Sequence, residues 1–177
     1  MSRLLLACLA VGITFTLSGC FKSDFPLFNR FDSETPVAEG TYSYIDRDKK
    51  RKNAIVTLDG SATKFITPKD DGSAMIQTLL MRSIGEGYYV AMDEQNNYGL
   101  IEVRGRQVTE YEHENYCKDI LEIAQMERST PSDYGVSSVT GNDPKTCKFT
   151  SFDNLVRAIE TLLDRNAIDP LRTYQRQ

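Results

Sequence analysis

The chain has 177 residues, of which 40% are hydrophobic and 26% are charged, and its formal net charge is −4. These values are ordinary for one globular domain, and they exclude a disordered chain, a collagen-like chain and a membrane protein with several spans. The acidic balance argues against a protein that binds nucleic acid through a basic surface. The chain has one histidine, which excludes a histidine-rich metal site, and we expect no metal and no cofactor.

The first twenty residues have the pattern of an export signal. Arg3 supplies one positive charge, and residues 4–17 form an almost wholly apolar run. This run is too short for a transmembrane helix, which needs about 20 residues, and it matches the hydrophobic region of a secretory signal. The sequence Leu17-Ser18-Gly19-Cys20 follows, and it resembles the lipobox of bacterial prolipoproteins.

That resemblance covers residues 1–20 only. It implies that residues 1–19 are removed as a signal peptide and that Cys20 is lipidated and begins the mature chain. A lipid group with two or more acyl chains anchors a protein stably on a membrane. Phe21 stands where an aspartate would resemble an inner-membrane retention signal, so the resemblance favours the outer membrane, with the domain facing the periplasm. The alternative is an ordinary cleaved signal with a cysteine at its boundary.

Two of the four cysteines remain in the soluble part, Cys117 and Cys147. An even pair in an exported protein is typical of a disulfide. Two free thiols or a redox pair are the alternatives, and the absence of a C-x-x-C sequence disfavours a redox pair.

Residues 20–38 are expected to form the tether between the anchor and the domain. They contain a cluster of phenylalanines whose spacing would place four of them on one stripe of a helix: Phe21, Phe25, Phe28 and Phe31. One interpretation is a surface that touches lipid or a partner. We favour the other, a segment that packs back onto the domain, because clustered exposed phenylalanine promotes aggregation.

The single globular domain is expected over residues 39–165. Alternating apolar and polar residues separated by turn sequences predict about seven antiparallel strands, over residues 41–45, 53–58, 62–67, 73–84, 88–92, 98–103 and 107–111. The segment Ser73–Ile84 also fits a helix, and we prefer a strand because strands flank it. Such a meander closes into a small barrel or a curved sheet, because open edges invite aggregation.

Two helices are predicted after the strands, over residues 115–127 and 152–163, and the second has the clearer apolar spacing. Thr150 and Asp153 resemble a capping arrangement for it. Residues 129–146 are predicted to be a long loop, and residues 166–177 a frayed polar tail. The predicted fold class is therefore α+β, a β-meander followed by two C-terminal helices.

No motif in the sequence indicates catalysis. His113 has three carboxylates close by in the chain, but along a strand they do not converge with it on one face, so we interpret this segment as a solvated strand end. The chain has no G-x-S-x-G, no phosphate-binding loop, no dinucleotide fingerprint and no EF-hand spacing. The sequence therefore predicts that the protein is not an enzyme. A hydrolase that uses two carboxylates is a weak alternative.

Two groups of residues are candidates for contact with other molecules. A basic cluster at a predicted hairpin tip suits an anionic surface, although a solvated turn is the favoured interpretation: Arg47, Lys49, Lys50, Arg51 and Lys52. Several strand tyrosines suit a ligand pocket or a partner surface, although half-buried strand positions are the favoured interpretation: Tyr42, Tyr44, Tyr88, Tyr89, Tyr98 and Tyr111.

Together these features predict a lipid-anchored cell-envelope protein that is not an enzyme and that works through contact with a protein partner or in envelope assembly. The alternative is a barrel that binds lipid or another small molecule. Contact with the membrane is expected through the anchor at Cys20, and no nucleic-acid partner is expected.

Overall fold

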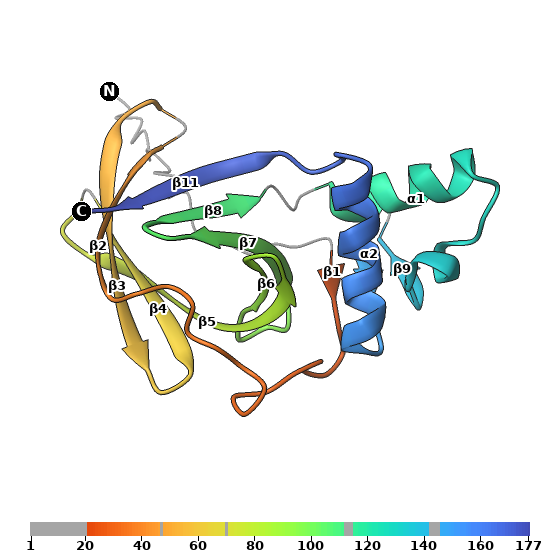
Figure 1. The fold of residues 1–177 in the computed structure, drawn as a ribbon, viewed down its shortest axis with the longest axis horizontal. Helices are drawn as coiled ribbons and strands as arrows, with labels where there is room; N and C mark the ends of the chain where they lie inside the picture. Colours follow the sequence, from red (N-terminus) through yellow and green to blue (C-terminus); the bar gives the residue numbers. More distant parts are fainter. Residues whose placement is uncertain (1–20, 47, 70, 112–114, 142–145) are drawn as a thin grey trace, which may run out of the picture.

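The structure is a computed structural model that describes residues 21–46, 48–69, 71–111, 115–141 and 146–177. A closed antiparallel barrel of eight strands forms one part, and two helices with a small sheet form the other (Figure 1). The barrel strands are β2 (Gly40–Ile45), β3 (Arg51–Asp59), β4 (Ala62–Pro68), β5 (Ala74–Gly85), β6 (Tyr88–Met92), β7 (Tyr98–Arg104), β8 (Gln107–Tyr111) and β11 (Pro170–Arg176). The other part contains β1 (Phe21–Lys22), α1 (Tyr116–Met126), the 3-10 helix η1 (Pro131–Tyr134), β9 (Ser138–Thr140), β10 (Thr146–Lys148) and α2 (Phe152–Asp164).

The seven strands predicted from the sequence, β2 to β8, form a meander in which each strand pairs with the next. The ambiguous segment Ser73–Ile84 is the strand β5, as predicted. Leu79 and Met81 alternate along it with less buried neighbours and point into the barrel. Gly60 turns the chain between β3 and β4 with a φ of 62°, a conformation that glycine adopts without strain.

The prediction of a frayed polar tail over residues 166–177 is wrong, because Pro170–Arg176 forms β11. This strand pairs antiparallel with both β8 and β2, and it thereby closes the barrel (Figure 1). Pro170 lies at the first position of the strand, where a missing backbone N–H is tolerated. Tyr174, near the other end, is 1% exposed. The chain therefore completes its sheet only after it has built both helices.

Two hydrophobic cores share the strands β6 and β7. The first fills the barrel and consists of Val37, Tyr42, Tyr44, Ala54, Val56, Phe65, Leu79, Met81, Ala91, Ile101, Val108 and Tyr174. The second lies outside the barrel, where Val90, Tyr98 and Leu100 pack against the buried sides of α1 and α2. Because both faces of β6 are covered, its consecutive residues Val90, Ala91 and Met92 are all buried.

The predicted helices are confirmed, and the segment between them has more structure than the predicted loop. It contains η1 and also β9, which pairs with β10. The capping residue of α2 is Ser151 rather than Thr150, because the Ser151 hydroxyl accepts a hydrogen bond from the Asn154 N–H at 3.2 Å. Gly135 follows η1 with a φ of 85°, and a Cβ there would lie 2.1 Å from the carbonyl oxygen of Asn154, so only glycine fits.

A disulfide joins Cys117 at the start of α1 to Cys147 in β10, as predicted, with the two Cα atoms 5.2 Å apart. Both cysteines are fully buried. The two cysteines are 30 residues apart in the sequence, so the bond closes a loop of that length and restricts the conformations of the unfolded chain.

Replacing both cysteines with alanine is expected to lower the free energy of unfolding by about 3–4 kcal/mol. The loss follows from the loop that becomes free in the unfolded state, and chemical unfolding of the two proteins measures it. Reductant is the matched control, because it should lower the stability of the natural protein toward that of the variant and leave the variant unchanged. Equal stability of the two oxidised proteins would contradict this expectation.

Candidate functional site

Phe21, the first described residue, is part of the folded structure. Phe21 is 0% exposed, and its ring packs against Phe149 and Tyr116 at centroid distances of 4.8 and 5.2 Å. Its strand β1 pairs in parallel with β10. Cys20 lies outside the described residues.

The phenylalanine cluster does not form the single helix stripe that its spacing predicted. Phe28 packs against Phe152 and Tyr98 at centroid distances of 5.4 and 6.2 Å and is buried like Phe21. Phe25 and Phe31, by contrast, are 52% and 99% exposed. The segment therefore packs back onto the domain at two phenylalanines and presents the other two to its surroundings.

The basic cluster lies at the turn between β2 and β3, with Arg47 outside the described residues. Lys49, Lys50 and Arg51 are exposed there, and Lys52 forms an ion pair with Asp46 at 3.2 Å. In Figure 1 this turn lies at the upper left, and β1 lies on the other side of the barrel, beside α2.

The candidate tyrosines do not line one surface. Tyr42 and Tyr44 lie inside the barrel, whereas Tyr98 lies in the outer core, where its hydroxyl accepts a hydrogen bond from the Leu27 N–H at 2.9 Å. Burial raises the pKa of Tyr98 to about 12. Tyr88 and Tyr89 are half-buried neighbours on β6 and point to opposite sides of the sheet. All six candidate tyrosines lie in strands; Tyr88, Tyr89 and Tyr111 are half-buried, and the other three are fully buried in the two cores.

A cluster of three polar side chains is buried inside the barrel where β8, β11 and β2 adjoin: Arg172, Tyr174 and Glu110. Arg172 Nη1 donates a hydrogen bond to the Tyr174 hydroxyl at 3.0 Å and lies 3.9 Å from Glu110 Oε2. The Tyr174 hydroxyl donates in turn to Glu110 Oε2 at 3.4 Å. Burial raises the pKa of Tyr174 well above its usual value, so this donor keeps its proton. The Arg172 guanidinium also lies over the Tyr44 ring, 4.9 Å from its centroid.

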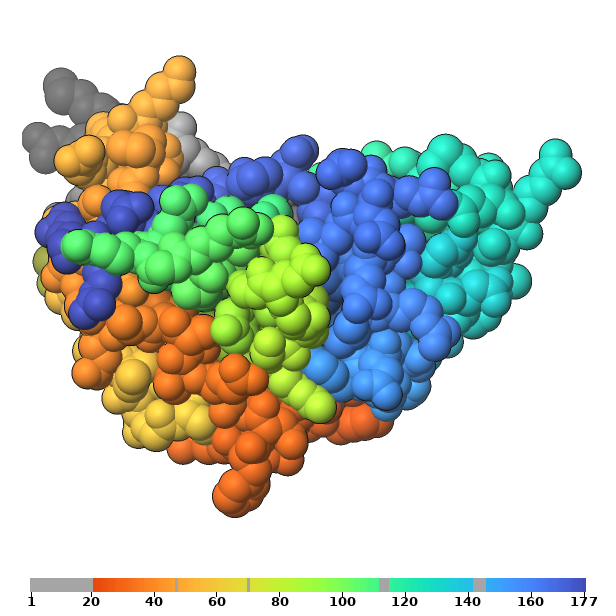
Figure 2. Space-filling model, viewed as in Figure 1, coloured from red at the N-terminus to blue at the C-terminus, as the bar shows by residue number. Residues whose placement is uncertain are grey.

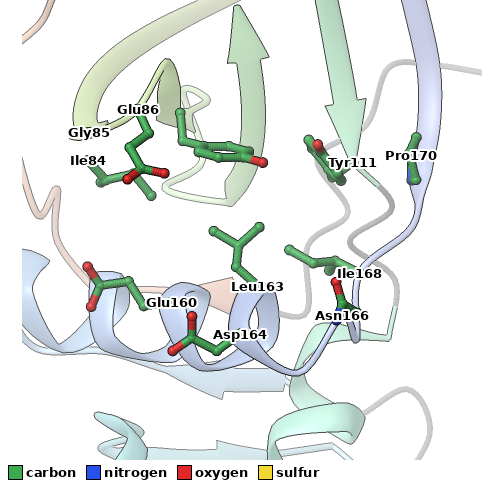
Figure 3. Close-up of a pocket in the computed structure, with 11 residues that line it drawn as sticks. Ile84, Gly85, Glu86, Tyr111, Glu160, Leu163, Asp164, Asn166, Ile168 and Pro170 are labelled. Atoms are coloured by element: carbon green, nitrogen blue, oxygen red, sulfur yellow. The ribbon is translucent and has the colours of Figure 1, made fainter.

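A groove of 720 Å³ runs between α2 and the β5–β6 side of the barrel. In the space-filling view the surface of the β5–β6 region borders that of α2 (Figure 2). Figure 3 shows Glu86 and Leu163 extending into the groove from opposite sides, with Glu160 and Asp164 along α2. A second cleft of 570 Å³ shares Ile84 and Glu160 with it and continues along α2. We call the two clefts together the α2 groove.

One wall of the α2 groove is aromatic and held in place by hydrogen bonds. The rings of Tyr88 and Tyr111 lie 6.2 Å apart. The Tyr111 hydroxyl donates to Glu102 Oε2 at 3.1 Å, and Arg104 forms an ion pair with the same carboxylate. Burial and its hydrogen bonds to Tyr88 and Glu102 raise the pKa of Tyr111, which keeps it a donor.

Three carboxylates border this aromatic wall: Glu86, Glu160 and Asp164. Among the described residues, none of these three carboxylates forms an ion pair. Within that part of the chain, the acidic end of the groove therefore has no lysine or arginine paired with it. Glu86 has a φ of 53° between two glycines that also have positive φ values. The Val103 N–H binds the carbonyl oxygen of the adjacent Gly87 at 2.8 Å and fastens this turn to β7.

Sequence reasoning missed the α2 groove. Glu160 and Asp164 are four residues apart on the exposed side of a helix, a pattern typical of a solvated face. The carboxylate between two glycines was the one local signal, and by itself it indicates only a turn.

His113 lies outside the described residues, and the described ones contain no group of three side chains suited to hold a metal ion. In that same part of the chain, no helix has the length and apolar content to cross a bilayer. No protein family, no curated protein and no solved structure matches this chain.

Proposed function

We propose that this protein is a lipid-anchored component of the bacterial cell envelope that binds a protein partner and is not an enzyme. The observation that carries the proposal is the burial of Phe21 directly after the lipobox cysteine. The mature chain then begins inside the folded domain, so the anchor holds the domain against the lipid surface. The disulfide supports an oxidising compartment such as the periplasm.

This anchoring gives the domain a direction relative to the membrane. The part with β1, α1 and α2 lies next to the lipid, and the exposed Phe25 and Phe31 are in position to touch it. The basic turn between β2 and β3 lies on the other side of the barrel from β1. We therefore assign that turn no role in binding the membrane that carries the anchor.

The alternative, a barrel that carries a small apolar molecule, needs space inside the sheet. The interior positions of the described strands hold large side chains in mutual contact, with Tyr44 and Tyr174 at a centroid distance of 5.0 Å and Phe65 and Tyr174 at 6.0 Å. This packing favours a partner bound on the outside of the barrel.

Replacing Cys20 with alanine tests the anchor. In cells fed a radioactive fatty acid, the natural protein should incorporate label and fractionate with the outer membrane, whereas the variant should carry no label and lose its membrane association. The matched control is Cys8→Ala, a cysteine within the signal, which should leave labelling unchanged. Label on the Cys20 variant, or a natural protein without label, would refute the anchoring proposal.

The partner is tested separately. Affinity purification from detergent-solubilised envelope should recover one protein in stoichiometric amount with the natural chain, compared with an unrelated lipoprotein carrying the same tag. Recovery of nothing above that background would count against an interaction role.

A further inference from the structure

We propose that the α2 groove binds an extended segment of a partner protein that presents an arginine or lysine to the acidic end of the groove. This inference rests on the proposed function for the existence of a protein partner, and it adds the chemistry of the segment and the place where it binds.

Charge complementarity identifies the residue bound at the acidic end. Glu86, Glu160 and Asp164 approach the groove from two sides, and no described cation pairs with them. Tyr88 and Tyr111 lie beside them, their rings in contact, and the Tyr111 hydroxyl is hydrogen-bonded to Glu102. Carboxylates next to aromatic faces suit a cation on an apolar stem, because the stem packs on the rings while the charge meets the carboxylates.

The middle and far end of the groove extend the site beyond a single cation. Ile84, Phe152 and Val156 supply apolar surface there, and the charged lining residues are Arg82 and Arg157 together with the carboxylates Asp153 and Glu160. The Arg82 guanidinium lies 4.0 Å from the centroid of the Phe152 ring, which holds it over the groove. The groove is therefore acidic at one end and carries both charges at the other.

The length of the groove selects a peptide over a small amine. The 13 residues of α2 rise about 18 Å along the helix axis. An extended peptide covers that distance with about five or six residues. A segment with a basic residue, then apolar residues, then an acidic residue that meets Arg82 and Arg157 fits the groove from end to end, whereas an amine headgroup would occupy only one end.

Fluorescence anisotropy with short peptides tests this site on the full chain, purified in mild detergent. The probes are two labelled hexapeptides, Arg-Gly-Ile-Val-Gly-Glu and its reversed sequence, because the groove does not dictate chain direction. One of them should bind, and replacing its arginine with glutamine should weaken binding about fivefold or more. The variant Glu160→Gln/Asp164→Asn should weaken binding of the arginine peptide to a similar extent.

A second variant separates the groove from general electrostatic attraction. Glu94→Gln/Glu122→Gln removes the same charge from exposed carboxylates that do not line the groove, and it should bind the peptide as the natural chain does. The proposal is overturned if neither peptide binds, if both variants weaken binding equally, or if arginine amide alone competes as well as the unlabelled peptide. The peptide measurement uses detergent-purified protein, whereas the Cys20→Ala experiment follows labelling and fractionation in cells. Absence of peptide binding would therefore leave the anchoring result unaffected, and absence of anchoring would leave the peptide-binding result unaffected.

Discussion

A chain that ends at Asp169 is expected not to fold, because it lacks β11 and the barrel cannot close. The truncation removes the backbone pairs that β11 makes with β8 and β2, so both become edge strands. It also removes Tyr174, whose ring is buried against Tyr44 and Phe65. Loss of one large buried aromatic side chain alone costs about 3–5 kcal/mol, and the total stability of a domain is about 5–15 kcal/mol.

Thermal unfolding followed by circular dichroism measures this effect, together with limited proteolysis and gel filtration. The truncated chain should show no cooperative transition, should be digested rapidly and should aggregate. A chain that ends at Arg176 is the control, because it keeps all of β11 and should unfold close to the natural protein. A cooperative transition of the Asp169 chain near the natural midpoint would contradict the role assigned to β11.

Replacing Arg172 with methionine is expected to lower the free energy of unfolding by about 3–5 kcal/mol, the usual cost of breaking a buried charge pair from one side. Glu110 is 5% exposed, and the change removes its neighbouring guanidinium. The Tyr174 hydroxyl loses its hydrogen-bond donor at the same time. Denaturant unfolding of the variant measures the effect.

Two further variants identify the cause. The double variant Arg172→Met/Glu110→Gln should recover much of the lost stability, because it leaves no buried carboxylate behind. Arg104→Met is the matched surface control: its side chain is 69% exposed, and it pairs with Glu102 at the outer face, so we expect a change of about 0–1 kcal/mol. An equal loss for Arg172→Met and Arg104→Met would show that the barrel interior does not depend on this charge pair.

The seven strands and both helices could be predicted because local patterns determine them. Residues in β2 to β8 alternate between interior and exterior, and α2 repeats its apolar residues at helical spacing. β11 lacked such a signal, since its inward residues include Arg172 and Arg176 rather than a row of apolar side chains. A charged residue points into this barrel only because Glu110, far away in the sequence, lies opposite on β8.

The candidate sites also separate into those that a local sequence pattern predicts and those that only the fold brings together. The disulfide could be predicted from the number of cysteines, and the anchor prediction rests on a contiguous motif. Which phenylalanines are buried depends on contacts with Tyr98 and Phe152, and no local pattern distinguishes Phe28 from Phe31. The α2 groove joins a helix to a hairpin turn about 75 residues earlier in the chain, so only the three-dimensional arrangement brings its carboxylates together.

The place of β11 after the other seven barrel strands in the sequence has a consequence for folding during synthesis. The ribosome releases residues from the N-terminus onward, so the strand that closes the barrel becomes available only after the seven strands that precede it. Until then β2 and β8 have open edges that proteases and other unfinished chains can reach. Any translation product that stops before Pro170 therefore leaves the barrel open at these two strands and is expected to be degraded.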